Sequence, residues 1–157
     1  MKHPAVHFII DWQEDQVVAT KLALAPRFEL CFSGDIPKSA SQAMRGWVQD
    51  YLEGHHRPFP SRLKKEGLTP FSQKVLDAME MIPFGETLSY GEVAQKIGSP
   101  RGMRAVGNAC RLNPFPLIIP CHRVISSTGK IGGFAYDLRI KEALLAFEGP
   151  LAQLALK

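Results

Sequence analysis

The sequence predicts a mixed α/β (α+β) protein with two lobes, a β-ribbon with one helix followed by a mainly helical lobe. Two β-branched runs lie near the start, and amphipathic patterns of helical period follow them. Residues 57–68 combine two prolines, a glycine and several charges, which is the composition of a linker. We therefore expect a first lobe over residues 1–68 and a second over 69–157.

The first lobe should begin with a hairpin. Residues 6–12 and 17–24 are apolar and β-branched, and the polar residues 13–16 between them suit a turn. Residues 28–32 are expected to add a third strand. Ser39 can cap a helix, whose apolar face would comprise Ala40, Met44, Trp47, Val48, Tyr51 and Leu52.

The second lobe should consist of short capped helices. Thr69 and Pro70 suit the N-cap and first position of a helix, and Ser89 with Glu92 forms a capping box for another. Ser99 and Pro100 are predicted to start the next helix, so that the pair has the proportions of a helix-turn-helix. A final amphipathic helix is marked by Leu138, Ile140, Ala143, Leu144 and Phe147.

The composition is that of a globular protein. Apolar residues make up 45% of its 157 residues and charged residues 22%, and no run approaches the ~20 apolar residues of a membrane span. The first residues do not have the pattern of a secretory signal. Three cysteines without CxxC spacing disfavour a disulfide framework and a zinc site. We expect a cytoplasmic protein with no bound metal.

The net charge of +4 is unevenly distributed. Residues 85–130 contain six lysines and arginines against two glutamates. Three of the basic residues, Arg101, Arg104 and Arg111, fall beside small residues on the second helix of the predicted helix-turn-helix. Small side chains also suit tight helix packing, but the neighbouring arginines favour contact with DNA phosphates.

A thiol and an imidazole are adjacent in Pro120-Cys121-His122-Arg123-Val124, directly after the apolar residues 117–119. Cysteine attacks as its thiolate, so a nearby base and cation, here His122 and Arg123, favour reactivity. Pro120 cannot continue a sheet ladder, so a strand predicted over residues 117–119 should end there. An isolated cysteine would more often be a buried core residue, but these neighbours favour a nucleophile.

These residues resemble the methylated-DNA-protein-cysteine methyltransferases, which repair O6-alkylguanine in DNA. The resemblance covers about residues 69–149. Its motifs are Phe71-Ser72-Gln73, Phe84-Gly85-Glu86, Ser89-Tyr90, Arg104-Ala105-Val106-Gly107, Asn113-Pro114, Ile119-Pro120-Cys121-His122-Arg123-Val124 and Glu148-Gly149.

The resemblance implies a ribonuclease-H-like first lobe and a winged helix-turn-helix-like alkyltransferase second lobe. It also implies a monomer without cofactors that acts on double-stranded DNA containing O6-alkylguanine. The alkyl group would pass irreversibly to Cys121, once per protein molecule. Activity on O4-alkylthymine is left open.

The family pattern also assigns roles to single residues. Cys121 would be the nucleophile, and His122 would assist it through a water, oriented by Glu148. Tyr90 would help to evert the nucleotide and donate a proton to the departing guanine. Asn113 would hold the turn between the DNA-binding helix and the cysteine. Without the resemblance, Glu148 and Tyr90 would pass for a helix-terminal acid and a packing aromatic.

Arg104 corresponds to the family's intercalating arginine, which fills the gap left by an everted base. The family places this second helix in the minor groove. Arg101 and Arg111 are expected to contact phosphates. The expected substrate pocket comprises Pro116, Val124, Phe134, Ala135 and Tyr136.

This pocket departs from the human-type pattern, because Phe134-Ala135 replaces Tyr-Ser and Tyr136-Asp137 replaces two glycines. The backbone N–H of Ala135 can still bond guanine O6, and the carbonyls of Cys121 and Val124 are expected to accept from the guanine amino group. Methyl groups should therefore be accepted, whereas bulky groups are an open question.

Two other functions fit parts of the sequence. A non-enzymatic protein that flags alkylated DNA would keep the helix-turn-helix but lack the cysteine, so Cys121 disfavours it. A Cys-His hydrolase would turn over and would not need Tyr90 and Arg104 beside a basic helix.

The histidines of the first lobe, His3, His7, His55 and His56, match no zinc pattern.

Overall fold

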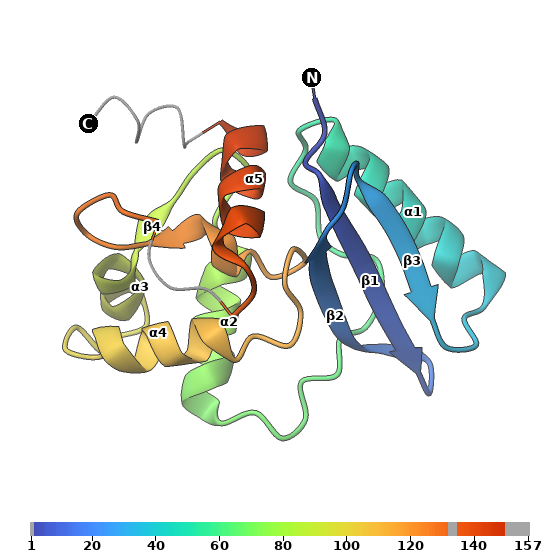
Figure 1. Cartoon of the computed structure of the whole chain (residues 1–157). Helices are drawn as coiled ribbons and strands as arrows, with labels where there is room; N and C mark the ends of the chain where they lie inside the picture. Colours follow the sequence, from blue (N-terminus) through green and yellow to red (C-terminus); the bar gives the residue numbers. More distant parts are fainter. Residues whose placement is uncertain (1, 132–134, 150–157) are drawn as a thin grey trace.

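The computed structural model describes residues 2–131 and 135–149. The described residues form five α-helices, and Figure 1 shows a small sheet with one of them on one side and the others gathered on the other. The predicted mixed α/β class is therefore confirmed. The lobe boundary after residue 68 stays a prediction. None of the described helices is long and apolar enough to cross a bilayer.

The first lobe contains a three-stranded sheet. β1 (Val6–Gln13) pairs antiparallel with β2 (Gln16–Leu24), and this hairpin was predicted. β3 (Glu29–Ser33) begins one residue later than predicted and pairs parallel with β1, giving the order β2-β1-β3. Every second residue of β1 from Val6 to Trp12 is buried, as expected for a sheet with one covered face.

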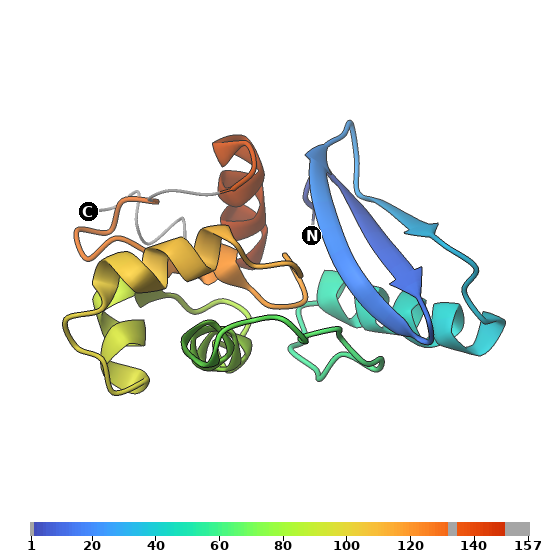
Figure 2. The same cartoon turned by 90° about the horizontal axis from the view of Figure 1, so that it is seen from below.

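α1 (Lys38–Leu52) covers that face of the sheet, as Figure 2 shows. Its buried residues, Met44, Val48 and Tyr51, follow the helical period of the predicted apolar face. The predicted cap was wrong, because Pro37 is the N-cap and Ser39 lies inside the first turn. Pro37 has an extended backbone and fixes φ at −60°, so the chain enters the helix without a side-chain cap.

The segment after α1 is attached to the sheet. The backbone N–H of Val17 donates to Arg62 O at 2.8 Å, and Lys64 N donates to Val17 O at 2.8 Å. Val17 and Leu63 thus form a short parallel bridge at the outer edge of β2. Despite its linker composition, this segment partly closes an open sheet edge.

Four helices and two short strands form the rest of the described chain. Thr69 caps α2 by accepting from Ser72 N, and Ser89 and Glu92 complete the capping box of α3, as predicted. Asp137 caps the last helix, and Gly149 ends it in a left-handed conformation. The elements are α2 (Pro70–Glu80), β4 (Leu88–Ser89), α3 (Tyr90–Lys96), α4 (Met103–Arg111), β5 (Val124–Ile125) and α5 (Leu138–Glu148).

α4 begins later than the sequence suggested. It starts at Met103 and not at Ser99-Pro100, because Gly102 N bonds Ser99 O at 2.8 Å and closes a turn first. Arg101 therefore lies in the turn before the helix, while Arg104 and Arg111 lie on the helix itself.

The apolar residues 117–119 do not form the predicted strand. Leu117 has a φ of 73°, and Ile119 N bonds Phe115 O at 2.8 Å, so the chain turns back on itself between Pro116 and Pro120. Neither proline has an N–H to offer a sheet ladder. A left-handed leucine is strained by roughly 1–2 kcal/mol, so the surrounding packing must hold it, and Leu117 is almost fully buried.

The two lobes share one buried core. It runs from the inner face of β1 through α1 and the turn at residues 115–119 to α2 and α5. The backbone N–H of Thr20 donates to Pro114 O at 2.9 Å, and its hydroxyl donates to Pro116 O at 2.8 Å. The middle of β2 is thereby bonded to the turn that leads to Cys121.

Candidate active site

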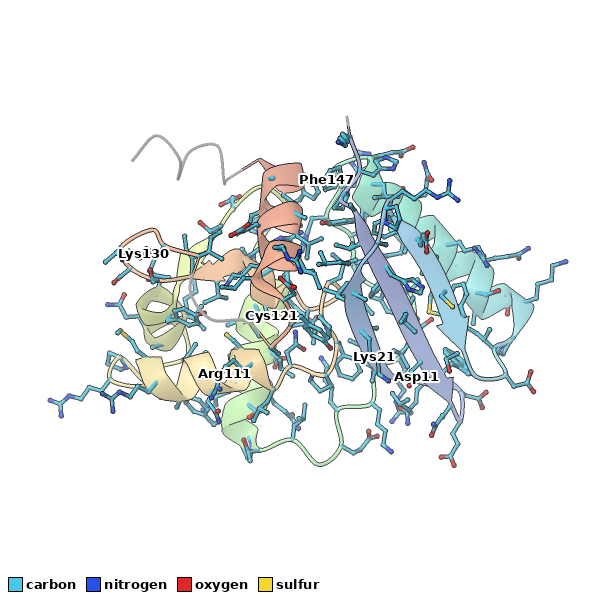
Figure 3. The ribbon with its side chains drawn as sticks, in the orientation of Figure 1. Asp11, Lys21, Arg111, Cys121, Lys130 and Phe147 are labelled. Atoms are coloured by element: carbon cyan, nitrogen blue, oxygen red, sulfur yellow. The ribbon has the colours of Figure 1, made fainter. Side chains whose placement is uncertain are left out.

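Cys121 opens a single 3-10 turn (Cys121–Arg123) between the buried turn at residues 115–119 and β5. Figure 3 shows it between the base of α5 and the sheet, with Arg111 on the neighbouring α4. Its side chain is largely buried, with 5% of the residue exposed. Because the chain is helical here, Cys121 and His122 are not on opposite sides of an extended strand, as the sequence had suggested.

Asn113 holds together the two ends of the buried turn at residues 115–119. Its side-chain Nδ2 donates to Ile119 O at 2.8 Å, and its Oδ1 accepts from Phe115 N at 2.9 Å. The side chain is buried and both halves of the amide are bonded, so an aspartate or leucine could not replace them.

Glu148, at the end of α5, is a buried hub for three side chains. Its Oε2 lies 2.6 Å from His122 Nε2 and accepts from Tyr51 Oη at 2.7 Å. Its Oε1 accepts from Arg123 Nε at 2.6 Å. Tyr51 comes from α1, so both lobes contribute to this network.

The charge of Glu148 is stabilised in place. Burial opposes ionisation, but the hydrogen bonds from His122 and Arg123 and the charge of the Arg123 guanidinium outweigh it and lower the pKa of Glu148 to about 2. Tyr51 is buried beside this carboxylate, and both burial and the negative charge raise its pKa. Tyr51 is therefore a protonated donor to an ionised acceptor.

These contacts fix the tautomer of His122. Burial lowers the pKa of His122 despite the adjacent carboxylate, so the ring is neutral at neutral pH. Nε2 must carry the proton because it faces Glu148, and Nδ1 is left as the basic nitrogen. Nδ1 is fully buried and has no hydrogen-bond partner among residues 2–131 and 135–149.

The thiol of Cys121 needs a base. Burial raises its pKa, and this effect exceeds the lowering by a hydrogen bond from Asn113 and by the charge of Lys141. Arg123 was expected to supply the cation, but its guanidinium is held by Glu148, Ile82 O and His56. Lys141 takes that place and was missed, since it resembles any lysine on an amphipathic helix.

Lys141 is fully buried in α5, and its ammonium donates to Val124 O at 2.8 Å. Burial lowers the pKa of Lys141 to about 8, although the sulfurs of Cys121 and Cys110 favour its charge. Cys110 is unsuited to attack, because burial raises its pKa to about 12 and its sulfur contacts Met79 Sδ at 3.5 Å.

A groove on the surface of α4 joins three of the predicted DNA-contacting residues. Its volume is about 360 Å³, and its lining includes Tyr90, Arg104 and Arg111, with Met103, Gly107 and Asn108. Burial and the sulfurs of Cys110 and Cys121 raise the pKa of Tyr90 to about 12, so the phenol stays protonated at neutral pH and can donate a hydrogen bond. Arg101 is exposed and does not line this groove.

The predicted substrate pocket is only partly described. Pro116 and Val124 are buried, Ala135 is exposed, and Phe134 lies outside the described residues. Tyr136 is half-buried, burial and the Cys121 sulfur raise its pKa, and its hydroxyl donates to Thr20 O at 3.5 Å. The carbonyls of Cys121 and Val124 already accept from Val124 N and Lys141 Nζ, respectively, which leaves each one further lone pair for a ligand.

Within the described part of the chain, no group of three or more His, Cys, Asp or Glu side chains could hold a metal ion.

The role of Tyr51 was also not predicted from the sequence. Tyr51 occupies a buried position of helical period on α1, which predicts packing and gives no sign of a bond to a carboxylate 97 residues away.

The profile of the 6-O-methylguanine DNA methyltransferase DNA-binding domain matches residues 70–150, which is just over half of the chain. The chain belongs to this family. A methylated-DNA--protein-cysteine methyltransferase of Methanothermobacter thermautotrophicus is 36% identical over 151 residues, which are 95% of this chain and 83% of that protein. The predicted family resemblance is thus confirmed.

Other family members match over a shorter stretch. The methyltransferase of Methanosarcina acetivorans is 47% identical over 102 residues, which are 65% of each chain, and the constitutive enzyme of Bacillus subtilis is 43% identical over 61% of its own length. The chain thus spans somewhat less than two thirds of these relatives in alignment. The crystal structure of Mycobacterium tuberculosis OGT in complex with DNA superimposes with a TM-score of 0.68 at 29% identity, covering 96% of this chain and 99% of that one.

Proposed function

We propose that this protein repairs DNA by direct reversal, transferring the alkyl group from guanine O6 to the sulfur of Cys121. The observation that carries the proposal is a single buried network. It holds a neutral His122, which directly follows Cys121 in the chain, with Nε2 bonded to Glu148 and Nδ1 left basic. The related methyltransferases and the DNA complex of the M. tuberculosis protein support DNA as the substrate.

In the proposed reaction, the thiol proton passes to His122 Nδ1, directly or through a water, and the sulfur attacks the alkyl carbon. The carbon–sulfur bond forms as the carbon–oxygen bond breaks, and guanine keeps the electron pair. Tyr90 is assigned to donate a proton to the departing base, since its high pKa keeps the phenol protonated. A thioether has no good leaving group, so each molecule acts once.

We assign DNA contact to the groove on α4. Arg104 would occupy the gap left by the everted nucleotide, and Arg101 and Arg111 would bind phosphates. The basic helix and its adjacent half-buried Tyr90 support this assignment. Pro116, Val124, Ala135 and Tyr136 would surround the base, and Asn113 would hold the reactive turn in place.

We further infer that the protein acts as a monomer in the cytoplasm, without a cofactor. Residues 1–68 would form a supporting lobe, whose Tyr51 holds Glu148, and residues 69–157 would form the catalytic lobe. The bonds from Thr20 to Pro114 and Pro116 support a role for the first lobe in holding the reactive turn.

Intact mass spectrometry after incubation with duplex DNA containing O6-methylguanine tests the proposal. We expect a gain of one methyl group per chain, confined to the peptide that contains Cys121. The Cys121→Ala variant should gain no methyl group but should still bind the alkylated duplex, and Cys110→Ala is the matched control that should be methylated like wild type. Binding without methylation of wild type would indicate a flag protein, and repeated cleavage of an ester a hydrolase.

A further inference from the structure

A second cavity lies behind the reactive turn, away from the groove on α4. It has a volume of about 530 Å³, within the range of small-molecule sites, and shares no lining residue with that groove. Its walls come from α1, the segment after α1, the end of α2 and the turn at residues 117–118. The residues used below are Trp47, Phe59, Arg57, Lys65, Glu80 and Arg123.

One side of this cavity is aromatic. The Trp47 ring stacks on Tyr51 with centroids 6.1 Å apart, and Phe59 packs edge-on against Trp47 at 5.2 Å. The indole Nε1 of Trp47 donates to Arg57 O at 2.9 Å, which fixes the orientation of the ring. A flat apolar group could therefore lie against a surface that already has a defined position.

The other side is cationic. Arg57, Lys65 and Arg123 line the cavity, whereas Glu80 is the sole carboxylate among its lining residues and pairs with Lys65 at 2.9 Å. Arg57 pairs with Asp50 at 3.1 Å, outside the lining. Arg57 and Lys65 are thus already paired with carboxylates. Arg123 is the lining cation whose remaining donors decide which ligand can bind.

The guanidinium of Arg123 has one terminal nitrogen to spare. Nε donates to Glu148, and Nη1 donates to Ile82 O at 2.7 Å and lies 3.2 Å from His56 Nδ1. Nη2 has no hydrogen bond to any residue that the structure describes. It is also not one of the fully buried polar atoms without a partner, and Arg123 is a lining residue of the cavity.

We propose that this cavity binds a small aromatic carboxylate. The carboxylate would accept from Arg123 Nη2, and the ring would lie against Trp47 and Phe59. A charge-assisted hydrogen bond to a partly desolvated guanidinium is among the stronger polar contacts in proteins. The site requires neither DNA nor a reactive Cys121, and it can be occupied while the groove on α4 is in use.

The test titrates the wild-type protein with benzoate and follows the indole N–H of Trp47 by ¹H–¹⁵N NMR. Trp12, in β1, does not line the cavity and serves as an internal control. Benzamide has the same shape without the charge, and acetate has the charge without the ring. We expect the Trp47 signal to shift and saturate with benzoate, with affinity about tenfold or more above that for either analogue.

Two variants locate the ligand. Phe59→Ala removes part of the aromatic wall and should weaken benzoate binding, and Arg123→Lys keeps the charge but removes Nη2 and should do the same. Lys38→Gln, on the opposite end of α1, should bind like wild type. The proposal is overturned if Trp47 does not respond at millimolar benzoate, if benzamide binds equally well, or if Phe59→Ala binds unchanged while remaining folded.

Discussion

The hydroxyl of Tyr51 donates to Glu148 Oε2 at 2.7 Å, on the same oxygen that faces His122 Nε2. The tyrosine belongs to α1 and the glutamate to the end of α5, so the carboxylate that sets the tautomer of His122 is held from both lobes. The first lobe, which carries no nucleophile candidate apart from the exposed Cys31, is in this way part of the site.

Tyr51→Phe should distinguish the contribution of the hydrogen bond to Glu148 from that of the packing of the ring. The ring stays, but a hydrogen bond to a buried ionised acceptor is lost, so we expect the free energy of unfolding to fall by about 1.5–3 kcal/mol. Methyl transfer should also slow, because Glu148 is less firmly oriented. Trp47→Phe is the matched control, since it removes another donor from α1 but leaves Glu148 untouched. Equal transfer rates in the two variants would refute the positioning role.

Glu148→Gln should affect both stability and transfer. It leaves the buried Arg123 without its counter-charge, which costs about 3–5 kcal/mol, and transfer should slow by roughly 100-fold. The exposed Asp137→Asn is the control, because asparagine keeps the cap of α5. A Glu148→Gln variant that transfers methyl groups like wild type would exclude Glu148 from the relay.

The buried ion pair of Glu148 and Arg123 makes the free energy of unfolding depend on pH. The pKa of Glu148 is depressed from its ordinary value of 4.5 to about 2, so its contribution is fully present above about pH 4.5 and is lost as the pH falls toward 2. Urea unfolding at several pH values should show this acid loss in wild type. In Glu148→Gln, the plot of the free energy of unfolding against pH should lack this loss between about pH 4.5 and 2.

Lys141→Met should make Cys121 less reactive. The lysine charge lowers the pKa of Cys121, so its removal should move the pH profile of thiol alkylation by a small reagent to higher pH. Because the pKa of Lys141 is itself about 8, the difference between variant and wild type should shrink above that pH. Lys130→Met, in an exposed loop, should leave the profile unchanged. An unaltered profile in Lys141→Met would remove this lysine from the site.

Arg104→Ala should mainly affect the rate of transfer from duplex DNA, and Arg101→Ala the affinity for DNA. Arg104 is assigned to an everted nucleotide, and unstacking costs a few kcal/mol only when the base starts inside a duplex. Arg104→Ala should therefore slow transfer from duplex DNA far more than from free O6-benzylguanine, provided that the pocket admits it. Arg101→Ala should lower affinity for all DNA and reduce the salt slope by about one unit.

Single-turnover rates at saturating DNA, measured beside salt titrations of affinity, distinguish the two roles. If Arg104→Ala slows both substrates equally, the arginine acts on the fold or the pocket and not on the everted duplex.

The sequence predicts those parts of the fold that depend on local patterns. The hairpin follows from alternating β-branched residues, and the caps at Thr69 and Ser89 follow from side chains that bond within three residues. Leu117–Ile119 looked like a strand, but two flanking prolines and tertiary packing impose a turn. The site was only half predictable, because the bond from Tyr51 to Glu148 spans 97 residues and the bond from Lys141 to Val124 O spans 17, and neither leaves a local pattern in the sequence.

The bonds from Thr20 to Pro114 and Pro116 also constrain the order in which the protein can fold. Thr20 leaves the ribosome 96 residues before Pro116, and until then the middle of β2 has an unpaired edge that could pair with another chain. This part of the sheet edge is therefore covered late in synthesis, by the same turn that leads to Cys121. A nascent chain that stops short of this turn would expose the edge of β2 to pairing with other chains.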